Sequence, residues 1–504
     1  MTPPPRPHVF KFGGTSLADA PRIRHVADLV AERSPPPVVV VSALVGVTDS
    51  LEELGEAADP HARRGVVDAL RRRHRDALEA LGPEGPDRTA VAASLDAVFD
   101  RLASSLAASG DPHEDGRPDV SRSSDGPLPP HGSDRSPIGS HRSGGSPTAE
   151  STDRVLAAGE DLSARLMAYA LRSAGRPAEV VDARLVVRTD ARFGRALPDE
   201  EAIRTLARER LLPLLGGGVV PVVQGFVGAT ADGRTTTLGR GGSDFTAALL
   251  GAALGAERVH VWTDVDGILS GDPRAVQDAR VLERIGFEEA VELSYFGARV
   301  LHPEAAKHAV ARGVPLHIRN TFRPDGPGTL VLKERWGARG VAAVAFKPGV
   351  ALIKVRSRPA ALPYGFLARV FEVLARHRLP VDLVATSHSS TAFTLDEDEE
   401  IDAVSRELAE FSEVDVFRAL ATVTVVGRGL LAEPGVDGRV FREVGTTPIR
   451  LISQASDVSL SFMVDAEHAP DVVRRLHAAL VTGGAGGEVE NVRHVASLPA
   501  DRDR

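Results

Sequence analysis

The chain has 504 residues, of which 42% are hydrophobic and 26% are charged. This length exceeds the roughly 250 to 300 residues at which one hydrophobic core stops growing, so we expect at least two domains and no wholesale disorder. The absence of cysteine excludes disulfides, thiolate nucleophiles and Cys-ligated zinc. Sixty basic and 69 acidic residues give a net charge of −9, which predicts neither a nucleic-acid surface nor a membrane surface.

The sequence predicts no export signal and no membrane anchor. Residues 1–8 are proline-rich with a single arginine, which is not typical of a secretory signal. No apolar run approaches the roughly 18 residues that a membrane-spanning helix needs. We therefore expect a cytoplasmic protein with small-molecule substrates.

The first hundred residues alternate between predicted strands and helices. We predict strands over residues 8–12 and 37–43 with a helix over 20–32 between them, an order that implies a parallel sheet. Further helices are predicted over 66–81 and 90–108.

From residue 110 to 150 the composition changes abruptly. Gly, Ser, Pro, Asp, Arg and His dominate, with almost no large apolar residue to offset the entropy of ordering. We predict a disordered insertion. A docking segment is the alternative, because the segment carries charges of both signs.

After the insertion, regular structure is expected to complete an α/β domain that ends near residue 332. The predicted helices cover residues 153–173, 199–212, 243–254, 287–293 and 298–312. The predicted strands cover residues 178–182, 219–226, 259–263 and 315–318.

Residues 333–504 contain an internal repeat. One helix beginning near Arg369 leads into residues 380–384 and 389–395, and another beginning near Arg439 leads into residues 448–452 and 458–464. Two helix-strand-turn-strand units thus recur about 70 residues apart. Each unit is too small to bury its own faces, so we expect the units to pair.

Two glycine-rich turns each open a predicted helix, and the first of them stands at the end of a predicted strand. Lys11 precedes Gly13 and Gly14 in the first turn, where backbone amides and an ammonium favour a phosphate, although a simple tight turn is the alternative. Only five of the 60 basic residues are lysine, and Lys11 is the first of them. No Walker A loop, GxxxxGK[ST], is present.

The second turn, TTTLGRGGSD at residues 235–244, combines a helix start with a guanidinium and a carboxylate, although Ser243 and Asp244 could serve only as N-caps. Open parallel sheets bind ligands at the carboxyl ends of their strands, so we expect both turns to line one crevice. The acidic segment at residues 263–267 is predicted to bind a ribose, to position Mg²⁺, or only to shape a turn.

Eight ordered segments resemble the aspartokinase family over nearly the whole chain apart from residues 110–150. They are KFGGTS (11–16), VSALVGVTD (41–49), GED (159–161), RFGRA (192–196), TTTLGRGGSD (235–244), WTDVDGI (262–268), DPR (272–274) and FGARVLHP (296–303). The resemblance implies an amino-acid kinase fold over residues 1–332, with a mostly parallel sheet sandwiched by helices. Two α+β ACT domains would follow over residues 333–504, one interrupted by the other.

The resemblance also implies transfer of the ATP γ-phosphoryl group to the β-carboxylate of L-aspartate, with Mg²⁺ as cofactor and no metal held by protein ligands alone. Lys11 and Asp244 would be catalytic. The implied ATP-binding residues are Lys11, Phe12, Gly13, Gly14, Thr263, Asp264, Leu269, Arg274 and Arg299. The implied substrate-binding residues are Ser42, Thr48, Glu160, Phe226, Arg240, Gly241, Gly242 and Ser243.

Several positions depart from the family pattern. Leu269 stands where relatives place a tyrosine, and Arg299 where they place a lysine. His388 replaces a glutamate of lysine-sensitive relatives, the branch that the layout resembles most. The implied effector residues are Phe366, Leu367, Asp382, Thr386, Ser387 and His388.

Lysine, threonine or no amino acid at all remain possible effectors. We expect a monofunctional enzyme that assembles as a homodimer or homotetramer. The alternatives are another amino-acid kinase, such as a glutamate kinase, and a catalytically silent ACT-type amino-acid sensor.

Overall fold

The computed structural model describes residues 6–56, 59–108, 148–298, 301, 303–333, 340–358, 365–387, 389–397, 400–432 and 434–482. The chain divides into two compact units. The first comprises residues 1–16, 37–40 and 243–504, and the second comprises residues 17–36 and 41–242. None of the helices described is long and apolar enough to cross a membrane.

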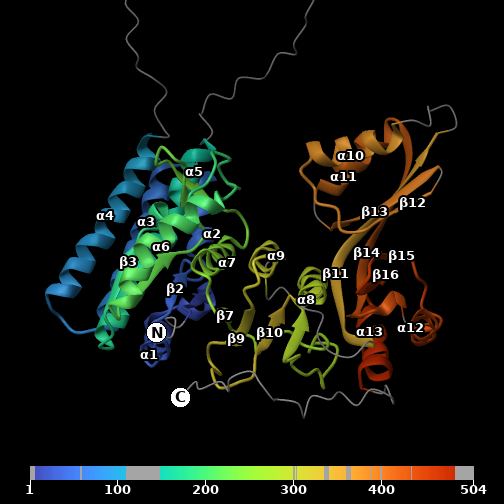
Figure 1. Ribbon diagram of the computed structural model, residues 1–504. Coiled ribbons are helices and arrows are strands. Elements are labelled where there is room, and N and C mark those ends of the chain that lie inside the picture. The colour runs from blue at the N-terminus through green and yellow to red at the C-terminus, as the bar shows by residue number, and fades with distance from the viewer. Residues whose placement is uncertain are drawn as a thin grey trace, which may run out of the picture. The chain divides into compact units, whose positions relative to one another are not determined.

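The second unit is built around one buried helix, α5 (Ala149–Ser173). Thr148 caps its first turn, and small and apolar residues then occupy nearly every side, a pattern that buries a helix all round. The helices that pack against α5 are α1 (Ala20–Ala31), α2 (Val47–Glu56), α3 (Pro60–Leu81) and α4 (Pro86–Ala108), as Figure 1 shows. The predicted insertion is therefore too long at its end, because residues 149–150 begin α5; residues 109–147 lie outside the described part of the chain.

Short strands complete the second unit. β3 (Ala178–Val181) pairs in parallel with β4 (Val220–Gln224), against which α6 (Glu200–Gly216) packs. β5 (Val227–Ala229) pairs antiparallel with β6 (Thr235–Thr237). The prediction that one strand continues to Phe226 is wrong, because Phe226 adopts a left-handed backbone with φ 65° that separates β4 from β5.

Parallel strands form one sheet region of the first unit. β1 (His8–Phe12) pairs in parallel with β7 (Arg258–Thr263), which pairs in parallel with β9 (Leu316–Asn320). β10 (Thr329–Leu332) then pairs antiparallel with β9 and parallel with β8 (Arg284–Gly286). The carboxyl ends of β1, β7 and β9 therefore lie at the same edge. β2 (Val38–Val41) is a fully buried strand of four valines, as its β-branched run predicts.

Three α-helices belong to the same region, namely α7 (Gly242–Leu254), α8 (Phe287–Leu293) and α9 (Pro303–Ala311). The predicted helix over residues 298–312 starts too early. Residues Ser294–Ala298 instead form a π-helix that continues from α8, and α9 begins at Pro303, where the fixed φ of proline suits the first turn.

The repeat region of the first unit forms a six-stranded sheet. Its central strands are β11 (Gly340–Ser357) and β14 (Ser412–Arg428), which pair antiparallel. β13 (Ser390–Asp396) and β12 (Val384–Thr386) continue the sheet beyond β11, and β16 (Ser459–Asp465) and β15 (Leu451–Ser456) continue it beyond β14. The strand predicted over residues 380–384 is wrong in position, since only Val384 of that segment belongs to β12.

The two central strands serve both halves of this sheet. Ala351, Ile353 and Val355 of β11 share a core with α10 (Phe366–Arg376) and α11 (Glu400–Ala409). Val344 and Phe346 share another with α12 (Val436–Val444) and α13 (Ala469–His477). Figure 1 shows the two pairs of helices at opposite ends of β11. The register shifts between Pro348 and Val350, where one half passes into the other. The two halves of the sequence repeat are thus joined through the shared strands β11 and β14, and each pair of helices covers a core of its own. The proposed domain boundaries at 332 and 333 stay predictions.

Candidate active site

Lys11 and Asp244 form the closest ion pair at the carboxyl edge of β1. Lys11 lies near the end of β1, and Asp244 lies in the first turn of α7. Their Nζ and Oδ1 atoms are 2.6 Å apart, and the two side chains are only 12% and 13% exposed. A shielded ammonium held by one carboxylate retains protons that it can donate to an incoming anion.

The residues after Lys11 are shaped for close approach. A Cβ on Gly13 would lie 3.5 Å from the Lys11 ammonium, an ordinary contact distance, so Gly13 lies directly beside this charge. Residues Gly14–Leu17 form a short 3-10 helix, and Ser16 is hydrogen-bonded to Thr321 at the end of β9 (2.7 Å). Phe12 is fully buried and its ring stacks on Trp262, so the ring belongs to the core and does not face a ligand.

A polar segment follows β7 at the same edge. The Thr263 hydroxyl donates to Asp264 (3.1 Å), and the Asn320 amide donates to Asp266 (2.7 Å). Asp266 also pairs with Arg323 (2.7 Å). Asn320 and Arg323 are not among the residues predicted from the sequence, although their place at the carboxyl end of a parallel strand was a signal that could have identified them.

The remaining predicted nucleotide residues differ in their surroundings. Arg274 forms a two-pronged ion pair with Asp272, with distances of 3.0 and 2.6 Å, which occupies the guanidinium and raises its pKa through the hydrogen bond to Asp272. Leu269 is half-buried and bridges to Val281. Arg299 lies outside the described residues.

In the second unit, the Glu160 side chain lies close to the backbone of Ala43. Its carboxylate is buried and accepts a hydrogen bond from the Ala43 backbone (3.1 Å), next to the predicted substrate residue Ser42. The preceding Gly159 makes this approach possible, because a Cβ there would lie 2.8 Å from the Ala43 side chain. Thr48, in the first turn of α2, is half-buried.

Asp153 connects two of the motifs that the sequence analysis quoted. Its buried carboxylate accepts from the Gly194 backbone (2.9 Å) and from both the backbone (2.9 Å) and the hydroxyl (2.8 Å) of Thr237. Burial raises the pKa of this carboxyl group even though these donors oppose the shift. Asp153 was missed, because a lone aspartate on a helix carries no distinguishing sequence signal.

The turn after β6 presents Arg240. Gly239 and Gly241 have φ of 78° and 73°, which glycine adopts without strain, and Gly242 leaves room for the Phe226 ring, which a Cβ would approach to 2.7 Å. Arg240 is exposed and forms no hydrogen bond or ion pair with any described residue. Its guanidinium is therefore available for a carboxylate. Ser243, at the start of α7, is mostly buried.

The predicted effector residues lie in the six-stranded sheet region. Asp382 is 6% exposed and already pairs with Lys347 (2.7 Å), while the Tyr295 hydroxyl donates to it (2.8 Å). Phe366 packs against the core beneath α10, and Leu367 is 42% exposed. Thr386 ends β12, and Ser387 is hydrogen-bonded to Ser390 across the following turn (2.7 Å). His388 lies outside the described residues.

Comparisons with known proteins agree with these observations. Residues 7–320 match the Amino acid kinase family, and residues 423–480 match the ACT domain. Lysine-sensitive aspartokinase 3 of Escherichia coli (strain K12) is 36% identical over 481 residues, which covers 94% of this chain and 98% of that protein. Aspartokinase 3, chloroplastic, of Arabidopsis thaliana is 31% identical over 494 residues, covering 94% of this chain and 81% of its own length.

Solved structures give the same result. The crystal structure of E. coli aspartokinase III in complex with aspartate and ADP (R-state) superposes with a TM-score of 0.75 at 35% identity, covering 94% of this chain and 99% of that one. The complex of that enzyme with lysine and aspartate (T-state) gives a TM-score of 0.78 at 34% identity with the same coverage. The predicted fold class, an amino-acid kinase fold followed by ACT domains, is confirmed. The chain belongs to the aspartokinase family.

Proposed function

We propose that this chain is an aspartate kinase, which transfers the γ-phosphoryl group of ATP to the β-carboxylate of L-aspartate and yields 4-phospho-L-aspartate. The observation that carries the proposal is the shielded Lys11–Asp244 pair (2.6 Å) beside glycines at the carboxyl edge of a parallel sheet. The aspartokinase relatives, aligned over most of their lengths, support the same reaction.

Each group of residues has a proposed task in this reaction. Two anions must be brought together, so positive charge and oriented N–H groups matter more than a nucleophile from the protein. Lys11 and the Gly13 and Gly14 amides neutralise the transferring phosphoryl group. Asp244 orients Lys11. One expected nucleotide contact is Phe12 at the end of β1. The others lie at the end of β7 and beyond, namely Thr263, Asp264, Leu269, Arg274 and Arg299.

In the second unit, Arg240 clamps the α-carboxylate of aspartate, and Glu160 pairs with its α-ammonium. The exposed guanidinium of Arg240, which has no partner within the described part of the chain, and the buried carboxylate of Glu160 support these assignments. The other expected substrate contacts are Ser42, Thr48, Phe226, Gly241, Gly242 and Ser243. The expectation that the two glycine-rich turns line one crevice stays a prediction.

Mg²⁺ is the expected cofactor. Among the described residues, no group of three or more His, Asp or Glu side chains could hold a metal ion. This suits Mg²⁺ in a kinase, which is commonly bound by one or two carboxylates together with nucleotide phosphates, and Asp244 and Asp264 are the carboxylates available for that role. When bound, the ion would neutralise charge on the phosphates.

The decisive test is ATP-dependent hydroxamate formation with aspartate, glutamate and acetylglutamate as separate acceptors. We expect turnover with aspartate, in line with the aspartokinase relatives, and little with glutamate. Acetylglutamate should fail as well, because its acylated nitrogen carries no ammonium to pair with Glu160. Turnover with glutamate alone would transfer the assignment to another amino-acid kinase. No turnover with any acceptor would favour a silent amino-acid sensor.

We also propose feedback by an amino acid at the ACT region of a cytoplasmic homodimer or homotetramer. Leu367 and Phe371, one turn apart on α10, are 42% and 38% exposed, which favours self-association of this region. The E. coli relative has been solved with lysine bound. Repeating the assay with lysine or threonine added, and determining the molecular mass in solution, tests both points.

A further inference from the structure

A charged cavity lies within the second unit, and none of the residues that line it is among those assigned to the substrates. It has a volume of about 520 Å³ and is lined by α4, α5, the segment at residues 182–184 and the first residue of β6. Four arginines face it, namely Arg101, Arg154, Arg165 and Arg184. The volume falls in the range of roughly 300 to 1,000 Å³ that is typical of small-molecule sites.

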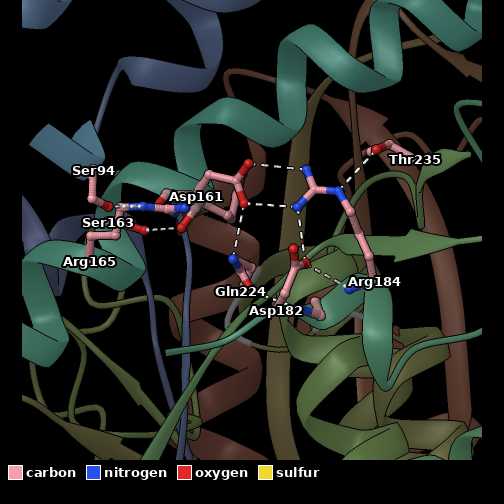
Figure 2. Close-up of polar contacts among 10 residues, drawn as sticks. Ser94, Asp161, Ser163, Arg165, Asp182, Arg184, Gln224 and Thr235 are labelled. Carbon is pink, nitrogen blue, oxygen red and sulfur yellow. Dashed lines mark hydrogen bonds and ion pairs between the residues drawn. The ribbon is translucent and has the colours of Figure 1, made fainter. Parts of the chain in front are cut away.

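Arg184 is the arginine whose charge is compensated. Figure 2 shows its guanidinium between Asp161 and Asp182, with Nη1 to Oδ1 distances of 3.0 and 3.1 Å respectively. It also donates to the hydroxyl of Thr235 (2.9 Å), while Gln224 donates to Asp161 (3.0 Å). The two carboxylates of the cavity are thus engaged by this one arginine and its neighbour Gln224.

Arg165 is held by neutral oxygens instead. Its guanidinium donates to the Ser94 hydroxyl (2.6 Å) and to the Asp161 backbone carbonyl, and it forms no ion pair with a carboxylate of any described residue (Figure 2). Burial is the main reason that the pKa of Arg165 lies below its ordinary value. The Asp161 carboxylate opposes this shift, whereas the charge of Arg101 adds to it. The Asp182 carboxylate also opposes the shift and the charge of Arg184 adds to it, so the lowered pKa reports mainly the burial of this guanidinium.

Arg101 and Arg154 add two further positive charges to the lining of the cavity. Both are exposed at the cavity, and neither forms a hydrogen bond or ion pair with the described part of the protein. Four guanidinium groups facing two carboxylates leave an excess of two positive charges. Val98 and Leu102 of α4 add apolar side chains to the same lining.

We infer that this cavity binds a small dianionic metabolite through Arg101, Arg154 and Arg165. The ligand carries either a phosphate group or two carboxylates, since both offer the paired oxygens that a guanidinium fork accepts. A short carbon skeleton would lie against Val98 and Leu102. The inference does not depend on the proposed kinase reaction.

The test is calorimetric titration of the full chain with inorganic phosphate and, separately, with succinate, at low ionic strength. We expect at least one of them to bind, and Arg101→Ala/Arg154→Ala to weaken that binding roughly tenfold or more, because charged hydrogen bonds are lost. The matched control is Arg72→Ala/Arg210→Ala, which removes two exposed arginines of the same unit outside the cavity and should leave binding within about twofold. Binding of phosphate would indicate a ligand with a phosphate group, and binding of succinate would indicate a ligand with two carboxylates.

A Lys11→Met variant separates this cavity from the candidate active site. Binding that persists in Lys11→Met and is lost in the Arg101/Arg154 variant supports the cavity. The inference is overturned if neither anion binds the unmodified chain, if both double variants weaken binding equally, or if Lys11→Met abolishes it.

Discussion

Two of the five lysines form close ion pairs with aspartates in the first unit. Their surroundings differ in a way that distinguishes a candidate catalytic lysine from a structural one. Lys11 contacts one carboxylate, Asp244, at 2.6 Å, with a glycine beside its ammonium. Lys347 contacts two carboxylates, Asp382 at 2.7 Å and Asp396 at 2.5 Å. Both lysine side chains are similarly shielded, at 12% and 15% exposure.

The number of carboxylates decides what each ammonium can still do. The Lys11 ammonium keeps N–H groups that can donate to a ligand. The Lys347 ammonium is instead bound to two aspartates that are distant from it in the sequence. Burial alone would lower the pKa of Lys347, but hydrogen bonds to Asp382 and Asp396 outweigh it and raise the pKa. A shielded lysine therefore indicates a catalytic role only when its partners leave part of it free.

The largest expected effect is on catalysis at Lys11. We expect Lys11→Arg to lower the kcat for aspartyl hydroxamate by roughly 100-fold or more, because a planar fork cannot replace a compact ammonium at a preorganised site. Lys307→Arg, which alters an exposed lysine on α9, serves as the control and should leave kcat nearly unchanged. A rate close to that of the unmodified enzyme would reject the role of Lys11.

The next effect is on stability at Lys347. Lys347→Met leaves the buried Asp382 carboxylate without its cation, so we expect the free energy of unfolding to fall by about 2 kcal/mol, less than for a fully buried pair because Lys347 is partly exposed. Urea denaturation of the full chain measures it. Adding Asp382→Leu should recover part of the loss, and a double variant as unstable as the sum of its single variants would contradict the pairing.

Tyr295→Phe removes one hydrogen bond from the same cluster. The Tyr295 hydroxyl donates to Asp382 (2.8 Å), and burial, followed by that hydrogen bond, raises the pKa of this phenol well above its ordinary value. We expect a loss of about 1 kcal/mol in the free energy of unfolding, the typical worth of such a bond. A double-mutant cycle with Lys347→Met should show coupling, and strict additivity would mean that the two contacts act separately.

Asp396→Asn should have the smallest effect. The Asp396 side chain is 56% exposed, and Lys347 retains Asp382 when Asp396 is neutralised. We expect a change below about 0.5 kcal/mol in the same denaturation experiment. A loss as large as that of Lys347→Met would show that Asp396, and not Asp382, is the main partner.

Much of the local structure was predictable because it depends on nearby residues. The β-branched run in β2, the proline at the start of α1 and the small and apolar residues of α5 are local signals that matched the observed elements. Boundaries failed where a single backbone angle or a distant contact decided them, as at Phe226 and in the segment before β12.

The sequence by itself determined the order of strands and helices, the placing of Lys11 near a strand end and of Asp244 in a helix start, and the family, because motif spacing and hydrophobic periodicity are properties of neighbouring residues. Only the tertiary structure decided which charges meet. Three pairs join side chains that are 23, 35 and 84 positions apart in the sequence, namely Asp161 with Arg184, Lys347 with Asp382, and Asp153 with Thr237. No local pattern encodes such contacts, since they arise from packing and from the need to neutralise buried charge.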